Sequence, residues 1–66
     1  MRYSDFVTIV EAYGFRCTRS NGDHEIYRHK GVVEIVNIQN DNGKAKSYQV
    51  KQFLFLNRKV QFETGG

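Results

Sequence analysis

The first stretch of the chain places its apolar residues with the period of an amphipathic helix. Four of them recur three or four positions apart: Phe6, Ile9, Val10 and Tyr13. Ser4 is a natural N-cap, and Gly14 can adopt the left-handed conformation that ends many helices. The pattern predicts a helix over residues 4–14, closed by a contact between Phe15 and its last turn.

Residues 15–20 and 23–29 are typical of two strands, and Asn21-Gly22 between them is a strong hairpin signal. A two-residue turn there would set Arg19 opposite His24 and Cys17 opposite Ile26. One side of the hairpin would then face the core with Phe15, Cys17, Ile26, Arg19 and His24, and the other would be solvated with Arg16, Thr18, Glu25 and Tyr27. His24 would lie on the core-facing side but at the turn end, beyond the covering helices.

The second half of the chain predicts one more strand and one more helix. Residues 32–38, VVEIVNI, form the strand, with either face suitable for burial, and residues 39–46 form a polar loop. Ser47 is a plausible N-cap for the helix, whose stripe would be Val50, Phe53, Leu54 and Asn57. We expect one domain over residues 1–62, with Val60 and Phe62 folded back onto it, and a tail over residues 63–66.

The predicted order is therefore helix, three-stranded antiparallel meander, helix. A chain of 66 residues is long enough for one domain only. Two helices on one face of a small sheet form a stable two-layer arrangement. The sequence thus predicts an α+β fold of the α-β-β-β-α type.

Composition narrows the functional classes. The chain has a formal net charge of +3 and a single cysteine, Cys17, so it can form no internal disulfide and no multi-cysteine zinc site. Its first residues contain acids and lack the unbroken apolar run of a signal peptide, and no stretch reaches membrane-spanning length. We therefore expect a cytoplasmic protein without a membrane partner, and the modest positive charge is compatible with nucleic acid.

His24 is the main candidate for chemistry. Histidine titrates near neutral pH, which suits a general base, and Arg19 beside it could hold a phosphate. His24 and His29 have opposite strand parity, and no third ligand has metal-like spacing, so we expect no metal and no cofactor. The competing interpretation is a surface histidine without a function.

Several residues near the hairpin and in the second half could contact RNA. Arg28, Lys44 and Lys46 could bind phosphate, and the start of the second helix would add its own attraction for anions. Tyr27 could stack on a base. Solvated surface charge is the alternative explanation for the lysines.

The opening SDFVTIVEAYGFRCTRSNGDHEIYRH and, more weakly, the closing helix in SYQVKQFLFLNR resemble the HicA toxin family. These toxins are small ribonucleases paired with HicB antitoxins. The resemblance implies a double-stranded-RNA-binding-like fold and metal-independent cleavage of mRNA by the histidine of a Gly-x-His motif. That histidine is His24 here, and Gly22 would shape the turn before it. The implied partners are RNA and a HicB-like antitoxin.

The chain departs from the family pattern at two places. Members commonly have Gly-Ser-His-His where this chain has Gly-Asp-His-Glu, and Pro-x-His where it has Asn37-Ile38-Gln39. Acids on both sides of the base would repel phosphate, which leaves a weakened enzyme open. Two alternatives also remain: a non-catalytic double-stranded-RNA-binding module, and a protein-interaction domain of the same fold, which exposed Tyr48 or Phe55 would favour.

Overall fold

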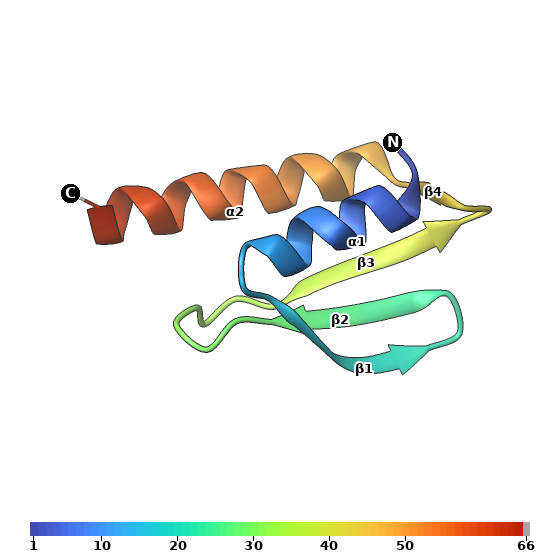
Figure 1. Cartoon of the computed structure of the whole chain (residues 1–66), viewed down its shortest axis with the longest axis horizontal. Coiled ribbons are helices and arrows are strands. Elements are labelled where there is room, and N and C mark those ends of the chain that lie inside the picture. Colours follow the sequence, from blue (N-terminus) through green and yellow to red (C-terminus); the bar gives the residue numbers. More distant parts are fainter. Residues whose placement is uncertain (66) are drawn as a thin grey trace.

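A computed structural model describes the backbone of residues 1–65 and the side chains of residues 1–59. The elements, in chain order, are α1 (Tyr3–Ala12), β1 (Arg16–Asn21), β2 (His24–Arg28), β3 (Val36–Asp41), β4 (Lys44–Ala45) and α2 (Ser47–Gly65). The strands form one antiparallel sheet in the order β1-β2-β3-β4, and both helices lie on the same side of it (Figure 1). The predicted α+β class and the two-layer arrangement are confirmed, with a short fourth strand added.

The C-terminal end of α1 is as the sequence predicts. Gly14 has a φ of +93°, and two backbone hydrogen bonds close the helix: Gly14 N–H donates to the Glu11 carbonyl and Phe15 N–H to the Val10 carbonyl. This pair of bonds is the Schellman motif, and it directs Phe15 into the core. A side chain at position 14 would also collide with the His29 ring, since an added Cβ would lie 2.9 Å from it.

The predicted start of α1 is wrong. The helix begins at Tyr3, with Arg2 at the N-cap position and no side-chain capping bond. Tyr3 N–H donates to the Gly43 carbonyl, and Arg2 forms a bridge with Lys44 in β4. Contacts with a distant turn therefore set the start of the helix, and Ser4 lies within its first turn.

The predicted register of the first hairpin is also wrong. β1 ends at Asn21, which pairs with His24, so the loop residues are Gly22 and Asp23. Only Gly22 has a positive φ, +63°, which is the pattern of a type II′ turn. An irregularity between Cys17 and Arg19 shifts the register once more.

The turn alone moves each partner by two residues and keeps the faces, but the irregularity leaves Cys17 paired with Tyr27 in place of Ile26, so β2 is turned over. Tyr27, expected in solvent, is 3% exposed in the core, and Glu25 faces the same way. His24 and Ile26, expected on the core-facing side, lie on the opposite face. A slip of one residue exchanges the two faces of a strand because side chains alternate.

β3 begins later than predicted, and the expected polar loop is a hairpin. Asn42 and Gly43 have φ values of +51° and +84°, which suits a type I′ turn between β3 and β4. Residues 29–35, between β2 and β3, form a loop that contributes Val32 to the core.

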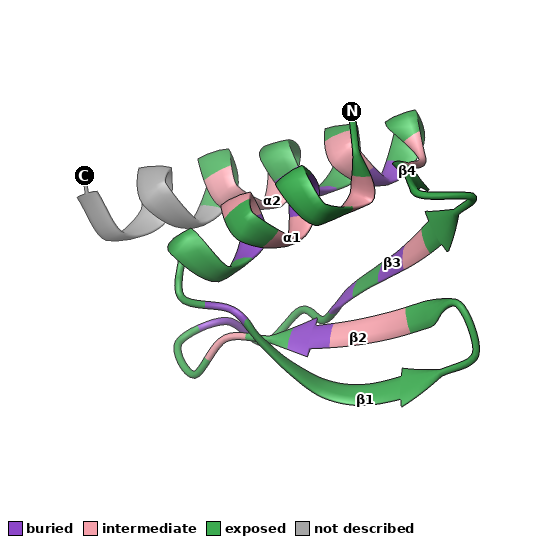
Figure 2. Ribbon diagram, turned by 45° about the vertical axis from the view of Figure 1, so that its right-hand side comes forward, coloured by how far each residue is buried: buried purple, intermediate pink, exposed green. Residues whose placement is uncertain are grey.

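The core lies between the sheet and the helices (Figure 2). Its buried apolar side chains are Phe6, Val10, Phe15, Tyr27, Val32, Val36, Ile38 and Phe53. Phe53 packs edge-to-face against Phe6, Tyr13 and Phe15, with ring centroids 5.5 to 5.8 Å apart.

The predicted stripe of α2 is correct at Phe53 and wrong at Leu54, which is 52% exposed. Gln49 is buried instead, and its side-chain oxygen accepts the Gln39 N–H at 2.8 Å, which satisfies a buried polar atom. The backbone of α2 runs to Gly65, through most of the predicted tail, and the predicted positions of the Val60 and Phe62 side chains lie outside the described residues. Within residues 1–65 no helix has the length and apolarity needed to cross a membrane.

Candidate functional site

The sheet has one face that no described helix covers, and the register decides which side chains lie on it. Directly paired residues point to the same face. Ile26 pairs with Arg19 and Asn37, and His24 pairs with Gln39. Arg28 follows Ile26 at the next position of the same parity. We call this the open face, and it includes Arg19, Asn21, His24, Ile26, Arg28, Asn37, Gln39 and Asp41.

His24 is the first residue of β2 and directly follows the turn. Its side chain is 46% exposed, and its Nε2 lies 3.7 Å from the nearer carboxylate oxygen of Asp23. Asp23 is itself held in place, because its other oxygen accepts the Gln39 side-chain amide at 3.1 Å and its backbone carbonyl accepts the Asn40 N–H at 2.9 Å. The Asp23 carboxylate therefore lies within ion-pair distance of the His24 imidazole, oriented by its bonds to Gln39 and Asn40.

The structure places Arg19 and Arg28 together on the open face, but neither is opposite His24. Arg19 pairs with Ile26, which is two residues further along β2 than His24, its predicted partner. Both guanidinium-bearing side chains line one hollow of about 410 Å³. The Arg16 guanidinium is used elsewhere, donating to the Glu11 and Phe15 carbonyls at the end of α1.

Three more of the predicted residues, Gly22, Lys44 and Lys46, lie at the end of the sheet that carries the two hairpin turns (Figure 1). Gly22 forms the turn before His24 and has no heavy atom near the position a Cβ would take. Lys44 pairs with Asp41 across β3 and β4. The Lys46 ammonium lies 4.0 Å from the Asp41 carboxylate, directly before α2. Asp41 therefore offsets part of the positive charge expected here.

Tyr27 is the one predicted RNA contact that the structure contradicts. Its ring is buried, and its hydroxyl donates to Glu25 at 3.5 Å. A base cannot stack on a ring that is enclosed by the core. The reason is the register shift that turned β2 over.

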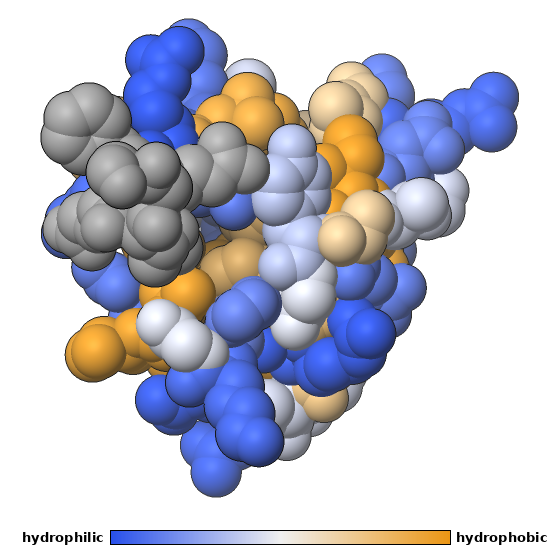
Figure 3. Space-filling model, turned by 60° about the vertical axis from the view of Figure 1, so that its left-hand side comes forward, coloured by the Kyte–Doolittle hydropathy of each residue, from blue (hydrophilic) through white to orange (hydrophobic). Residues whose placement is uncertain are grey.

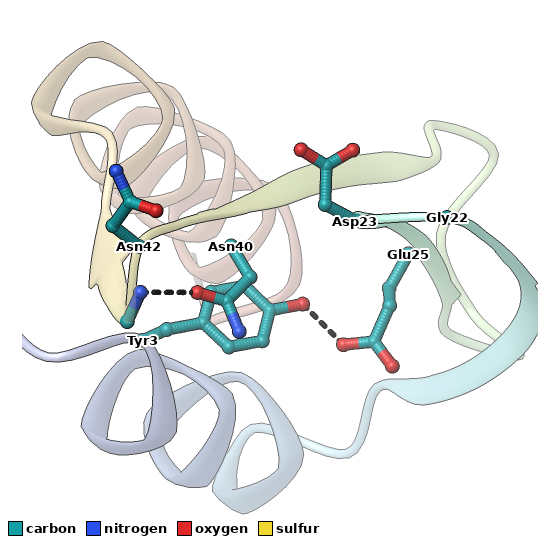
Figure 4. Close-up of a pocket in the computed structure, with 7 residues that line it drawn as sticks. Tyr3, Gly22, Asp23, Glu25, Asn40 and Asn42 are labelled. Carbon is teal, nitrogen blue, oxygen red and sulfur yellow. Dashed lines mark hydrogen bonds between the residues drawn. The ribbon is translucent and has the colours of Figure 1, made fainter.

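A second hollow of about 560 Å³, on the helix side of the sheet, was not predicted (Figure 4). Its lining combines carboxylates, amides and a phenol: Tyr3, Gly22, Asp23, Glu25, Asn40, Asn42 and Gly43. The Tyr3 hydroxyl donates to Glu25, which ties α1 to β2. Neither residue stands out in the sequence, because their contact depends on the register and on the early start of α1. With the Glu25 carboxylate and no cation in its lining, this hollow does not suit phosphate.

The two phenols that face Glu25 resist ionisation. Burial, followed by the nearby Glu25 carboxylate, raises the pKa of Tyr27 to about 12 and raises the pKa of Tyr3 as well. Unfolded tyrosine ionises near pH 10. The stability due to the neutral phenols is therefore complete below pH 10 and is lost as the pH rises toward 12.

We expect the free energy of unfolding to fall by about 1 kcal/mol through Tyr27 alone between pH 8 and pH 11. Urea unfolding at the two pH values measures it. The Tyr27→Phe variant is the control, since it lacks the titrating group but keeps the ring, and it should lose less stability than the wild type over the same interval. Equal losses in the two proteins would contradict this account of Tyr27.

Among the residues that the structure describes, no three histidine, cysteine or acidic side chains gather as a metal site requires. His29 has a structural environment: its Nδ1 accepts the Gly31 N–H at 2.9 Å and its ring packs edge-to-face on Phe15. His24 is thus the histidine available to a ligand.

A family model of known proteins matches this chain. The family model described as the HicA toxin of bacterial toxin–antitoxin systems matches residues 3–56, which include α1, the whole sheet and the first half of α2. No curated protein and no solved structure matches the chain. Because the match covers most of the 66 residues, this chain belongs to the HicA toxin family.

Proposed function

We propose that this toxin is an endoribonuclease that cuts mRNA without a metal ion, with His24 as its general base. The observation that carries the proposal is the position of His24 on the open face. It is accessible, it has a fixed carboxylate beside it, and it shares its face with two arginines. A base, a group that stabilises its protonated form and cations for phosphate are the parts that RNA cleavage requires.

In the proposed reaction, His24 removes the proton from a ribose 2′-hydroxyl, and the resulting oxygen attacks the adjacent phosphorus. A new bond forms between this oxygen and phosphorus, and the bond from phosphorus to the 5′ oxygen of the next nucleotide breaks. The departing oxygen takes a proton from the imidazolium or from water. Asp23 stabilises the imidazolium, and Arg19, together with Lys44 or Lys46, stabilises the charge that develops on the phosphate.

The acids on both sides of His24 do not act alike in this arrangement. Glu25 points to the other face of the sheet and accepts the Tyr3 hydroxyl, so it lies away from RNA on the open face. Asp23 alone remains beside the base. The Gly-Asp-His-Glu sequence is therefore compatible with an active enzyme.

Cleavage of a labelled single-stranded RNA by the purified protein, in the presence of a chelator, tests this function. We expect cleavage to continue, since the proposed steps use only side chains of the toxin. A requirement for added divalent ions would contradict the metal-independent mechanism. Tight binding without any cleavage would instead support a non-catalytic RNA-binding module.

We further propose that a HicB-like antitoxin silences the enzyme by covering the open face. Diethylpyrocarbonate, which acylates accessible imidazoles, should modify His24 in the free toxin and leave it unmodified in the complex. Mass spectrometry of the peptides measures this, with His29 as an internal reference because its ring is partly covered in the toxin itself. A complex in which His24 reacts as fast as in the free toxin would exclude this mode of inhibition.

Exposed aromatic side chains on α2 favour a second function, protein interaction. Tyr48 is 57% exposed and Phe55 is 71% exposed, far more than most aromatic side chains of a folded domain. They lie on the helix side, away from His24, so a protein contact there does not compete with cleavage on the open face.

A further inference from the structure

The hollow beside His24 on the open face has the composition of a nucleotide subsite. Its lining consists of Thr18, Arg19, Ile26, Arg28 and Ile35. The two isoleucines provide apolar contact surface, the two arginines provide cations, and no carboxylate is part of the lining. Such a combination suits a ligand with a flat apolar part and a negative charge.

Ile35 reaches this site from the loop between β2 and β3. Two apolar side chains of this loop are exposed, Val33 at 89% and Ile35 at 49%, whereas its Val32 is buried. Apolar atoms are visible at the surface at this end of the molecule (Figure 3). Lys59 of α2 holds the loop through Glu34, with 3.3 Å between ammonium and carboxylate. Ile35 is half-exposed, borders α2 on one side and lines the hollow on the other.

The register brings the hollow next to the proposed base. Ile26 is two residues beyond His24 on the same face, which is about 7 Å along a strand. Arg28 lies two residues further in the same direction. A chain of nucleotides that follows β2 would therefore pass from His24 to Ile26 and then to Arg28.

We propose that this hollow binds the nucleotide next to the one that is cut, and that the substrate is single-stranded RNA. The base lies against Ile26 and Ile35, and Arg19 and Arg28 bind its phosphate, since a guanidinium forms paired hydrogen bonds with phosphate oxygens. Only an unpaired, unstacked base can offer its face to side chains, whereas duplex RNA keeps its bases stacked. This proposal rests on the proposed ribonuclease function and adds a second contact to it.

The test compares RNA binding by variants in the full chain, each combined with His24→Ala to prevent cleavage. A fluorescent single-stranded oligoribonucleotide and a duplex of the same sequence are the probes. Arg28→Gln removes a proposed phosphate contact, and Arg58→Gln is the matched control, because it removes the same charge from α2 on the helix side. Ile26→Thr removes apolar contact and keeps a β-branched residue in the strand. Thermal melts establish that each variant is folded.

We expect Arg28→Gln to weaken single-strand binding by roughly 10-fold or more, and Ile26→Thr by about 3- to 10-fold. Arg28→Gln should also flatten the slope of log affinity against log salt by about 0.7, the value for one phosphate contact on a single strand. Arg58→Gln should change affinity by less than about 2-fold, as expected for a charge outside the site. Equal effects of Arg28→Gln and Arg58→Gln, or duplex binding as tight as single-strand binding, would overturn the subsite.

The outcome for cleavage is read separately, in proteins that keep His24. If the wild type cleaves RNA and Arg28→Gln cleaves it equally well at limiting substrate, the ribonuclease function stands and the subsite is wrong. If the wild type does not cleave but Arg28→Gln and Ile26→Thr weaken binding, the subsite is right and the ribonuclease function is wrong. If the hollow instead binds an antitoxin segment, the same variants should weaken the toxin–antitoxin complex and leave RNA binding unchanged.

Discussion

Replacing His24 by alanine should lower the rate of RNA cleavage by roughly 100-fold to 10,000-fold, the usual contribution of a general base. The structure gives this residue few other roles, because its side chain is half-exposed and makes no hydrogen bond within the described part of the chain. The loss of stability should stay within about 1 kcal/mol, as for other exposed positions. RNA binding should survive, since the arginines and lysines remain.

The experiment measures cleavage of a labelled RNA by both proteins after thermal melts show that both are folded. Asp23→Asn is a graded control, because it keeps the shape of the side chain beside His24 and removes the charge that stabilises the imidazolium. It should lower cleavage by less than His24→Ala does. Equal cleavage by the wild type and His24→Ala would dismiss His24 as the base.

Replacing Phe53 by alanine should destabilise the protein by about 3–5 kcal/mol, the typical cost of removing a buried aromatic side chain. Phe53 is 1% exposed and its ring contacts three other aromatic rings, so its loss leaves a cavity between both helices and the sheet. The free energy of unfolding of a natural domain is typically about 5–15 kcal/mol. A large part of the variant should therefore be unfolded at 37 °C, a temperature at which stability is typically below its maximum.

Phe55→Ala is the matched control for this prediction. It is the same substitution in the same helix, two residues away, but Phe55 is 71% exposed and lies outside the core. Its effect should stay within about 0.5 kcal/mol, as for most surface positions. Urea unfolding of the three proteins measures both effects. A loss from Phe55→Ala as large as that from Phe53→Ala would show that the core is built differently.

The elements with a strong local signal could be predicted from the sequence. The spacing of Phe6, Val10 and Tyr13 predicts α1, and Gly14-Phe15 predicts its end, because the Schellman motif depends on residues that are neighbours in the chain. Phe53 could likewise be predicted as a core residue of α2, from the helical spacing of the apolar residues around it. The Asn42-Gly43 turn carries an equally strong local signal, and interpreting its polar surroundings as a loop hid the fourth strand.

The features that depend on register could not be predicted. No local pattern signals the irregularity between Cys17 and Arg19, and its one-residue slip decides which face every residue of β2 occupies. Arg19 and Arg28 lie on the open face, and Tyr27 leaves it, because of that slip. The contact of Tyr3 with Glu25 depends on it too, since no local pattern connects residues that are far apart in the chain.

The mechanism is tested most directly with two RNA strands that differ by one oxygen atom. One is all-ribose, and the other has 2′-deoxyribose at the position 5′ to the bond that the wild-type toxin cuts. Both are incubated with the wild type in the presence of a chelator, and binding is measured alongside cleavage. The proposed mechanism predicts that both strands bind and that only the all-ribose strand is cut at this bond, because the attacking oxygen is missing from the other. Cleavage of the 2′-deoxy strand at the same bond would contradict it.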